Sequence, residues 1–179
     1  MKETALYGGA IHTVLPEDAI DVSKIRQVPD TQEVFILEKI RRELDRSLIF
    51  DLLERVPNNY EKVIELHIED LIDSQESNHL IERVHQKFVE TDIYFSFAMK
   101  GSLVVLISLL RLERAETDVL ISMNINVEEN YTIEQIKEAL LNTSETRLPS
   151  SLSILKEDYD VIKEASLNLQ IKDWSLFEG

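Results

Sequence analysis

The clearest hydrophobic pattern lies in the middle of the chain. Apolar and polar side chains alternate over residues 88–99, which predicts a strand with one buried face. Residues 103–112 are almost all apolar, as in a strand that is covered on both faces, and residues 117–126 predict a third strand. A two-residue turn at Lys100-Gly101 and the short links between these segments predict an antiparallel meander.

The segments on either side of this meander show shorter patterns. Asp21 can cap a single helical turn over residues 22–26, and Thr132 with Gln135 forms a capping box that opens another helix. Apolar residues recur at intervals of three and four over residues 47–56, which predicts an amphipathic helix. The other predicted elements are strands at residues 10–15, 32–37 and 167–171, helices at residues 60–72 and 154–165, and a loop at residues 142–153.

These elements define the expected architecture. A central strand that is apolar on both faces needs helices on both sides of its sheet, so the pattern predicts an α/β sandwich built on an antiparallel sheet. The chain of 179 residues has no internal repeat and no low-complexity tract, which favours one domain over residues 1–179.

The charge and composition of the chain narrow the classes of function. Asp and Glu number 34 against 19 Lys and Arg, which gives a formal net charge of -15. Nucleic-acid binding needs clustered basic residues and is not expected, whereas an acidic surface either favours a basic partner or serves solubility alone. The longest apolar stretch, residues 103–112, is too short for a membrane-spanning helix, so no membrane association is expected. The absence of cysteine excludes disulfides, thiolate metal sites and cysteine nucleophiles.

Two adjacent glycines, Gly8 and Gly9, stand out in a chain that has four glycines. A phosphate-binding loop would continue to Lys and then Ser or Thr, and a dinucleotide-binding turn would open a helix. Here a strand pattern follows, and the next lysine is Lys24. The pair is therefore predicted to serve the backbone, in a turn or at a close approach, and not to hold phosphate.

Candidate catalytic and metal-binding groups are sparse. The histidines form no H-E-x-x-H pair, and no G-x-S-x-G nucleophile motif occurs. His67 with Glu69 and Asp70 could hold a hard metal ion, but a half-buried histidine on a helix whose acids face water explains the cluster more simply. No metal and no cofactor is expected.

Acidic residues on the predicted helix over residues 47–56 form a candidate binding face. On a helix, Asp51 and Glu54 would be neighbours on the side opposite the apolar stripe, with Phe50 at the edge of that side. Paired carboxylates beside an exposed aromatic ring suit a basic protein partner. The same pattern also fits a solvated helix face with Phe50 packed on a neighbouring element.

Several segments carry a resemblance to a known family. In chain order they are LYGGAI, IDVSKIRQVPDTQEVF, SLIFDLLE, HIED, ETDVLISMN and DWSLF. With these segments the chain resembles the Ran guanine nucleotide release factors, and in particular their fungal members, over residues 7–177. The resemblance implies a fold similar to the PsbP type, with a central antiparallel sheet of about six strands between helices.

The resemblance also implies a function. Members of this family bind the small GTPase Ran, promote release of its guanine nucleotide and support nuclear protein import, without substrate turnover of their own. Ran is therefore the expected partner, and Ran's chromatin-bound exchange factor is a further one. Residence in nucleus and cytoplasm is implied in the same way, and a monomer is the default expectation.

In this family the Ran-binding surface is acidic. The matching motifs place Asp51 and Glu54 of DLLE on that surface, with Asp21, Asp30 and Glu33 as neighbours. The resemblance therefore assigns a partner to the two carboxylates that the spacing had only grouped together.

Two other functions remain open at this point. One is a scaffold that binds Ran without affecting its nucleotide. The other is a small-ligand carrier or an enzyme with a pocket between sheet and helices, whose polar groups would be Arg111, or His67 with Glu69.

Overall fold

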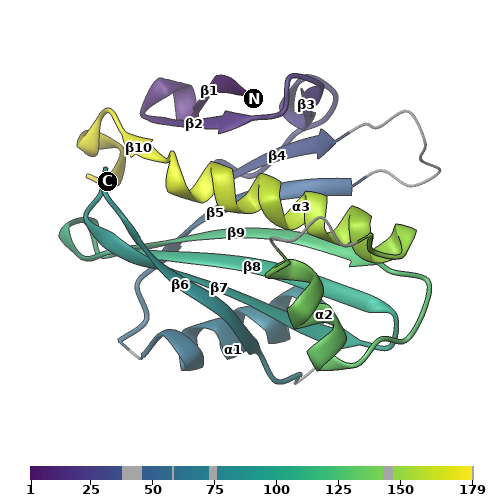
Figure 1. Cartoon of the computed structure of the whole chain (residues 1–179). Coiled ribbons are helices and arrows are strands. Elements are labelled where there is room, and N and C mark those ends of the chain that lie inside the picture. Colours follow the sequence, from purple (N-terminus) through teal and green to yellow (C-terminus); the bar gives the residue numbers. More distant parts are fainter. Residues whose placement is uncertain (38–45, 58, 73–75, 143–146, 179) are drawn as a thin grey trace.

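The strands of the protein form two sheets in a computed structural model that describes residues 1–37, 46–57, 59–72, 76–142 and 147–178 (Figure 1). Within these residues the larger sheet has seven antiparallel strands in the spatial order β3-β4-β5-β9-β8-β7-β6. Their bounds are β3 (Ala19–Asp21), β4 (Gln32–Leu37), β5 (Arg46–Glu54), β6 (His79–Gln86), β7 (Thr91–Lys100), β8 (Leu103–Leu112) and β9 (Thr117–Asn126). The smaller sheet pairs both β1 (Lys2–Leu6) and β10 (Gln170–Ile171) with β2 (Ile11–Leu15).

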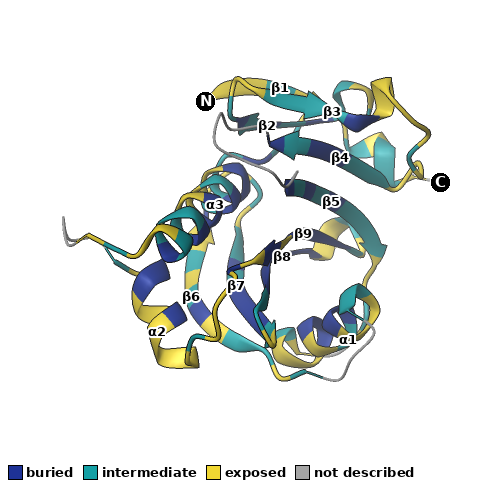
Figure 2. Cartoon of the chain, turned by 90° about the vertical axis from the view of Figure 1, so that its right-hand side faces the viewer, coloured by how far each residue is buried: buried dark blue, intermediate teal, exposed yellow. Residues whose placement is uncertain are grey.

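Helices cover both faces of the larger sheet. One face carries α1 (Tyr60–Ile72), and the other carries α2 (Ile133–Leu140) and α3 (Ser150–Leu167) (Figure 2). Short 3₁₀ turns are η1 (Tyr7–Gly9), η2 (Val22–Lys24), η3 (Glu113–Ala115) and η4 (Trp174–Phe177). The predicted α/β sandwich is confirmed, with one strand more in its main sheet than the expected six. Of the helices in the described ranges, none has the length and apolar character needed to cross a membrane.

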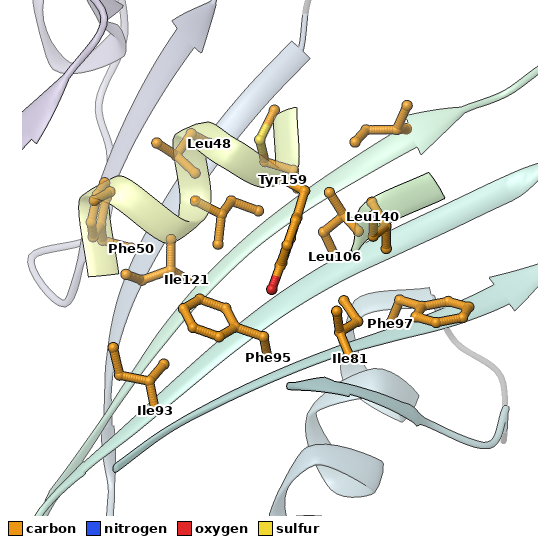
Figure 3. Close-up of a cluster of buried hydrophobic side chains, with 14 of the residues drawn as sticks. Leu48, Phe50, Ile81, Ile93, Phe95, Phe97, Leu106, Ile121, Leu140 and Tyr159 are labelled. Carbon is orange, nitrogen blue, oxygen red and sulfur yellow. The ribbon is translucent and has the colours of Figure 1, made fainter. Parts of the chain in front are cut away.

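Apolar side chains fill the space on both sides of the sheet. The larger cluster lies between the sheet and α3 (Figure 3), and among its members are Leu48, Phe50, Phe95, Leu106, Ile121 and Tyr159. Strand β8 contributes to both clusters, because Leu106 packs under α3 and Val105 and Ile107 pack under α1. This confirms the prediction that the segment 103–112 is covered on both faces.

Buried polar side chains also attach α3 to the sheet. Asp158 on α3 pairs with Arg46 at the start of β5, and both side chains are almost fully buried. The hydroxyl oxygens of Ser166 on α3 and Ser108 on β8 lie 2.6 Å apart in the same layer. Buried polar contacts of this kind favour one placement of the helix over the sheet, which apolar packing alone specifies less strictly.

Elements with strong local signals match their predictions. The bounds of β4, α1, β8 and β9 are those predicted. The capping box is confirmed, because Thr132 Oγ1 accepts from the Gln135 N–H at 3.1 Å and Gln135 Oε1 accepts from the Thr132 N–H at 2.8 Å. The predicted loop at residues 142–153 is shorter than expected, since α3 begins at Ser150, and residues 143–146 of it lie outside the described residues.

The predicted helix over residues 47–56 is wrong, because this segment belongs to β5. The strand pairs with β4 on one side and with β9 on the other. Every second residue from Arg46 to Phe50 is buried, which is the period of a strand. Ile49 and Leu53 make the second face partly apolar, and the sum of the two faces imitates the spacing of an amphipathic helix.

The meander also differs in detail from the prediction. The turn between β7 and β8 is formed by Gly101 and Ser102, one position later than predicted, and Gly101 has a φ of 61°. β7 begins at Thr91, because residues 87–90 form the turn that follows β6. The pattern does not reveal β6, where polar side chains occupy most positions.

Candidate functional site

The acidic residues implied by the resemblance lie at one side of the larger sheet, on and around β3, β4 and β5 (Figure 1). The register places Gln32 opposite Asp51 and Glu33 opposite Phe50. Residues in register share a face of the sheet, and consecutive residues alternate between faces. Glu33 is therefore on the α3 face with Phe50, and Asp51 is on the opposite face with Gln32.

Asp51 is a half-buried carboxylate with one oxygen left open. Its Oδ2 accepts a hydrogen bond from Gln32 Nε2 at 3.1 Å. Its Oδ1 is buried and has no hydrogen-bond partner among the described residues. Burial raises the pKa of the Asp51 carboxyl group, and the Gln32 hydrogen bond opposes this shift only in part. A buried acceptor without a partner costs stability.

Glu54 does not lie beside Asp51. It is the exposed last residue of β5, in register with Thr117 of β9. Three residues along a strand span about 10 Å and end on the other face, so the helical neighbour relation predicted for the two carboxylates is wrong. The expected exposed position of Phe50 is wrong as well, since this ring is completely buried in the α3 core.

The LYGG segment forms a turn whose backbone has left-handed (positive) φ angles. Tyr7, Gly8 and Gly9 have φ angles of 50°, 66° and 93° in succession. A Cβ atom on either glycine would meet no atom within 4 Å, so the glycines are needed for the backbone angles and not for space. The prediction that the pair serves the backbone is confirmed for the turn and not for a close approach.

Tyr7 connects this turn to the acidic strands. Its N–H donates to Glu33 Oε1 at 2.6 Å, and its hydroxyl donates to the backbone oxygens of Thr31 at 2.9 Å and Phe50 at 3.3 Å. Burial raises the pKa of the Tyr7 phenol, and the charges of Glu33 and Asp51 raise it further. The turn therefore fixes the Glu33 carboxylate and lies close to both acids.

Glu33 and Asp21 form the second part of the acidic region. Burial raises the pKa of the Glu33 carboxyl group, the Tyr7 N–H lowers it, and the nearby Asp21 charge raises it again. Asp21 caps η2 as predicted, since its Oδ1 accepts from the Ser23 N–H at 2.9 Å. Asp30 is exposed in the turn before β4. The structure thus groups Asp21, Glu33 and Asp51 around β4, with Glu54 at the far end of β5.

The polar groups named for the alternative pocket, Arg111, His67 and Glu69, differ in their surroundings. Arg111 Nε donates to Asp118 Oδ1 at 2.9 Å, and both side chains are buried. His67 is buried on α1, more deeply than the half-buried position predicted, and burial lowers the pKa of its imidazole while the Asp118 charge opposes this. Glu69 is exposed. Over the ranges that the structure describes, no group of three or more His, Cys, Asp or Glu side chains could hold a metal ion.

Sequence reasoning missed Tyr7 and Gln32 as parts of this region. Tyr7 contacts a residue 26 positions away, and no local pattern signals a contact of that range. Gln32 would follow from the register of β4 against β5, which could be proposed only after the segment 47–56 was read as a strand.

The fold matches that of a solved Ran-binding protein. The structure superposes on the crystal structure of the Saccharomyces cerevisiae Ran-binding protein Mog1p with a TM-score of 0.69 and 29% identity, covering 98% of this chain and 97% of that one. The family model described as Ran-interacting Mog1 protein matches residues 4–126. The chain belongs to the Mog1 family.

Curated relatives agree with this assignment. The chain is 31% identical to the nuclear import protein MOG1 of Saccharomyces cerevisiae, covering 98% of this chain and 84% of that protein. It is also 43% identical to the Ran guanine nucleotide release factor of Bos taurus over 77 residues, which cover 42% of this chain and 39% of that protein. The resemblance inferred from the sequence segments is thereby confirmed.

Proposed function

We propose that this protein binds the small GTPase Ran and promotes release of its guanine nucleotide, in support of nuclear protein import. Membership of the Mog1 family, with similarity along almost the whole chain to a nuclear import protein, carries the proposal. The protein acts as a regulator without catalytic turnover and works as a monomer in nucleus and cytoplasm. Ran's chromatin-bound exchange factor is a further partner.

The proposed contacts with Ran are made by the acidic residues. A GTPase holds its nucleotide through P-loop amides, the P-loop lysine and Mg²⁺. A partner loosens this grip only if it binds the nucleotide-free or metal-free state more tightly. Carboxylates suit this task, because they form strong charge-assisted hydrogen bonds with basic side chains that would otherwise face phosphate. Asp51 and Glu54 make these contacts, and Asp21, Asp30 and Glu33 orient the partner and speed its approach.

The strand geometry sharpens this proposal. Asp51 and Glu54 lie on opposite faces of β5, so one basic side chain of Ran cannot bridge them. They contact separate groups of the partner, and the effects of removing them are expected to add.

Removing both carboxylates is expected to slow nucleotide release. Loss of one charge-assisted contact that is made only in the nucleotide-free complex corresponds to about 1.4 kcal/mol, or about tenfold, so Asp51→Ala/Glu54→Ala should act about a hundredfold less efficiently. The measurement is release of fluorescent GDP from purified Ran against concentration of each single variant and of the double variant.

Glu138→Ala is the matched control, because Glu138 is an exposed acid on α2. It should behave as wild type, and thermal unfolding should show that the double variant is folded. Release by the folded double variant at the wild-type rate would contradict the assignment of Asp51 and Glu54. Wild-type binding that does not weaken with rising salt would contradict an electrostatic interface.

Lower pH is expected to weaken Ran binding. Burial raises the pKa of the Glu33 and Asp51 carboxyl groups, so they lose charge at higher pH than ordinary carboxylates do. Titration calorimetry between about pH 7.5 and pH 5.5 should show a steeper loss of affinity for wild type than for Glu33→Gln/Asp51→Asn, which cannot titrate at these positions. The amide that Glu33→Gln introduces keeps an oxygen that can accept from the Tyr7 N–H.

The stability of the single variant Asp51→Asn provides the control. When the pKa of a carboxyl group is higher in the folded protein than in the unfolded chain, its negative charge lowers the stability of the fold at pH values above the folded-state pKa. Below the unfolded-state pKa the group is protonated in both states and this cost is absent. Asp51→Asn should therefore be at least as stable as wild type at pH 7. If wild type and Glu33→Gln/Asp51→Asn lose affinity equally as pH falls, these two carboxylates do not act in binding.

A further inference from the structure

A surface groove of about 460 Å³ lies at one end of the larger sheet, where the β6–β7 turn and η3 approach η4. This end is away from α2 and beside β10 (Figure 1). Its lining includes Phe88, Val89 and Glu90 from the first turn, Glu113 and Arg114 from η3, and Trp174 from η4. The DWSLF segment that contributed to the family resemblance supplies one wall, and the acidic site does not use it.

The wall formed by Trp174 is held in place by several contacts. The Arg114 guanidinium lies 4.3 Å from the centre of the indole ring, as in a cation–π contact. The ring of Phe177 lies 5.8 Å from the indole within the same turn. The N–H groups of Lys172 and Asp173 donate to the Ala10 oxygen, which ties this turn to the residue that follows the LYGG segment. A ring held in this way loses little freedom when a partner binds.

Phe88, which also lines the groove, is an exposed aromatic residue. Its side chain is 56% exposed, and it is the largest exposed aromatic side chain among the described residues. The turn that carries it includes Glu90 at a φ of 51°, an uncommon angle for a residue with a side chain. Large aromatic side chains such as the Phe and Trp that flank this groove contribute much of the binding energy in protein interfaces.

The groove continues directly from the acidic end of β5. Glu54 is in register with Thr117, the Arg55 N–H donates to the Glu116 oxygen, and Arg55 Nη2 lies 3.5 Å from Glu113 Oε1. The lining also carries exposed Glu90 and two arginines, of which Arg111 pairs with buried Asp118 and Arg114 lies over the Trp174 ring. The exposed Glu90 and Glu113 carboxylates beside the two aromatic rings are complementary to an apolar side chain flanked by basic ones.

We propose that this groove is a second contact surface for Ran, which takes an aromatic or aliphatic side chain of the GTPase that has a lysine or arginine next to it. The inference rests on the proposed function and adds an apolar anchor to its acidic site. The carboxylates of β5 steer and pair with basic groups, and the Phe88–Trp174 groove slows dissociation by burying an apolar side chain.

Truncation of Phe88 tests this inference. We expect Phe88→Ala to bind nucleotide-free Ran about tenfold more weakly, chiefly through faster dissociation, and Phe88→Leu to retain most of the affinity. Because the lost contact is apolar, the salt dependence of binding should stay that of wild type, whereas Asp51→Ala/Glu54→Ala should flatten it. The Glu90→Gln/Glu113→Gln variant should lower the association rate while Phe88 keeps the dissociation rate slow.

Ile133→Ala is the matched control, since Ile133 is an exposed apolar residue on α2 at 39% exposure. It should bind as wild type, and the melting temperatures of the variants at Phe88, Glu90, Glu113 and Ile133 should agree with that of wild type because these side chains are exposed. If wild type does not bind Ran, the proposed function fails. If wild type binds, the acidic variant is impaired and Phe88→Ala binds normally, the groove inference alone is overturned. It is also overturned if sedimentation shows that Phe88→Ala instead disrupts a dimer of the protein itself.

Discussion

The free energy of unfolding of the Asp158→Ala variant is expected to be about 3–5 kcal/mol lower than that of wild type, because the change removes the carboxylate that pairs with the buried Arg46 charge. The side chains of Arg46 and Asp158 are 5% and 1% exposed, and they join β5 to α3 across the main core. A buried guanidinium that loses its carboxylate keeps the full cost of leaving water. Urea unfolding followed by circular dichroism gives the difference directly.

Two further variants serve as controls for the Asp158→Ala experiment. Lys156→Ala removes the exposed i,i+4 pair with Asp160 on the same helix, and it should cost less than about 1 kcal/mol. Arg46→Met/Asp158→Leu removes both buried charges and should recover most of the stability lost in Asp158→Ala. A loss in Asp158→Ala as small as that in Lys156→Ala would show that the pair is not buried as described.

The Phe50→Ala variant is expected to lose about 3–5 kcal/mol of stability, because a fully buried ring is replaced by a cavity. Phe50 has no exposed surface, and its ring meets that of Phe35 edge to face with centroids 6.2 Å apart. If this segment were a surface helix with Phe50 at the edge of its solvent side, the same change would leave stability nearly unaltered. Chemical denaturation therefore separates the two interpretations of residues 47–56.

Phe88→Ala is the matched comparison for this experiment, since it makes the same chemical change at an exposed turn. It should alter stability by less than about 0.5 kcal/mol. Equal stability losses at Phe50 and Phe88 would contradict the burial assigned to the two rings.

The segments that sequence reasoning located well are those whose signals are local. The near-continuous apolar run of β8 and the short apolar runs of β4 and β9, each preceded by a turn, locate these strands to the residue, and the capping residues Thr132 and Gln135 locate the start of α2. The prediction for residues 47–56, which contribute to β5, was wrong because their local signal is ambiguous. Their apolar residues fit both periods, and only pairing with β4 and β9, which are separate segments of the chain, decides for the strand.

The same distinction applies to the site. The resemblance supplied the acidic residues, and Asp21 was correctly expected to cap a turn. The arrangement of the carboxylates could not be predicted, because it depends on the faces of β5 and on the contact from Tyr7 to Glu33. The groove could not be predicted from the sequence either. Phe88 and Trp174, which both line it, are 86 positions apart in the chain and come together only when the sheet has formed.

The small sheet joins two segments that are far apart in the chain. β2 pairs with β1 from the start of the chain and with β10 from its last ten residues, and the Lys172 N–H donates to the Ala10 oxygen at 2.7 Å. Ala10 directly follows the turn that holds Glu33, and Trp174 comes shortly after the closing strand. The pairing of Gln170 with His12 joins residues that are far apart in the chain. Because long-range pairings of this kind form slowly, we expect the small sheet, and with it the support of Glu33 and the position of Trp174, to be completed late in folding.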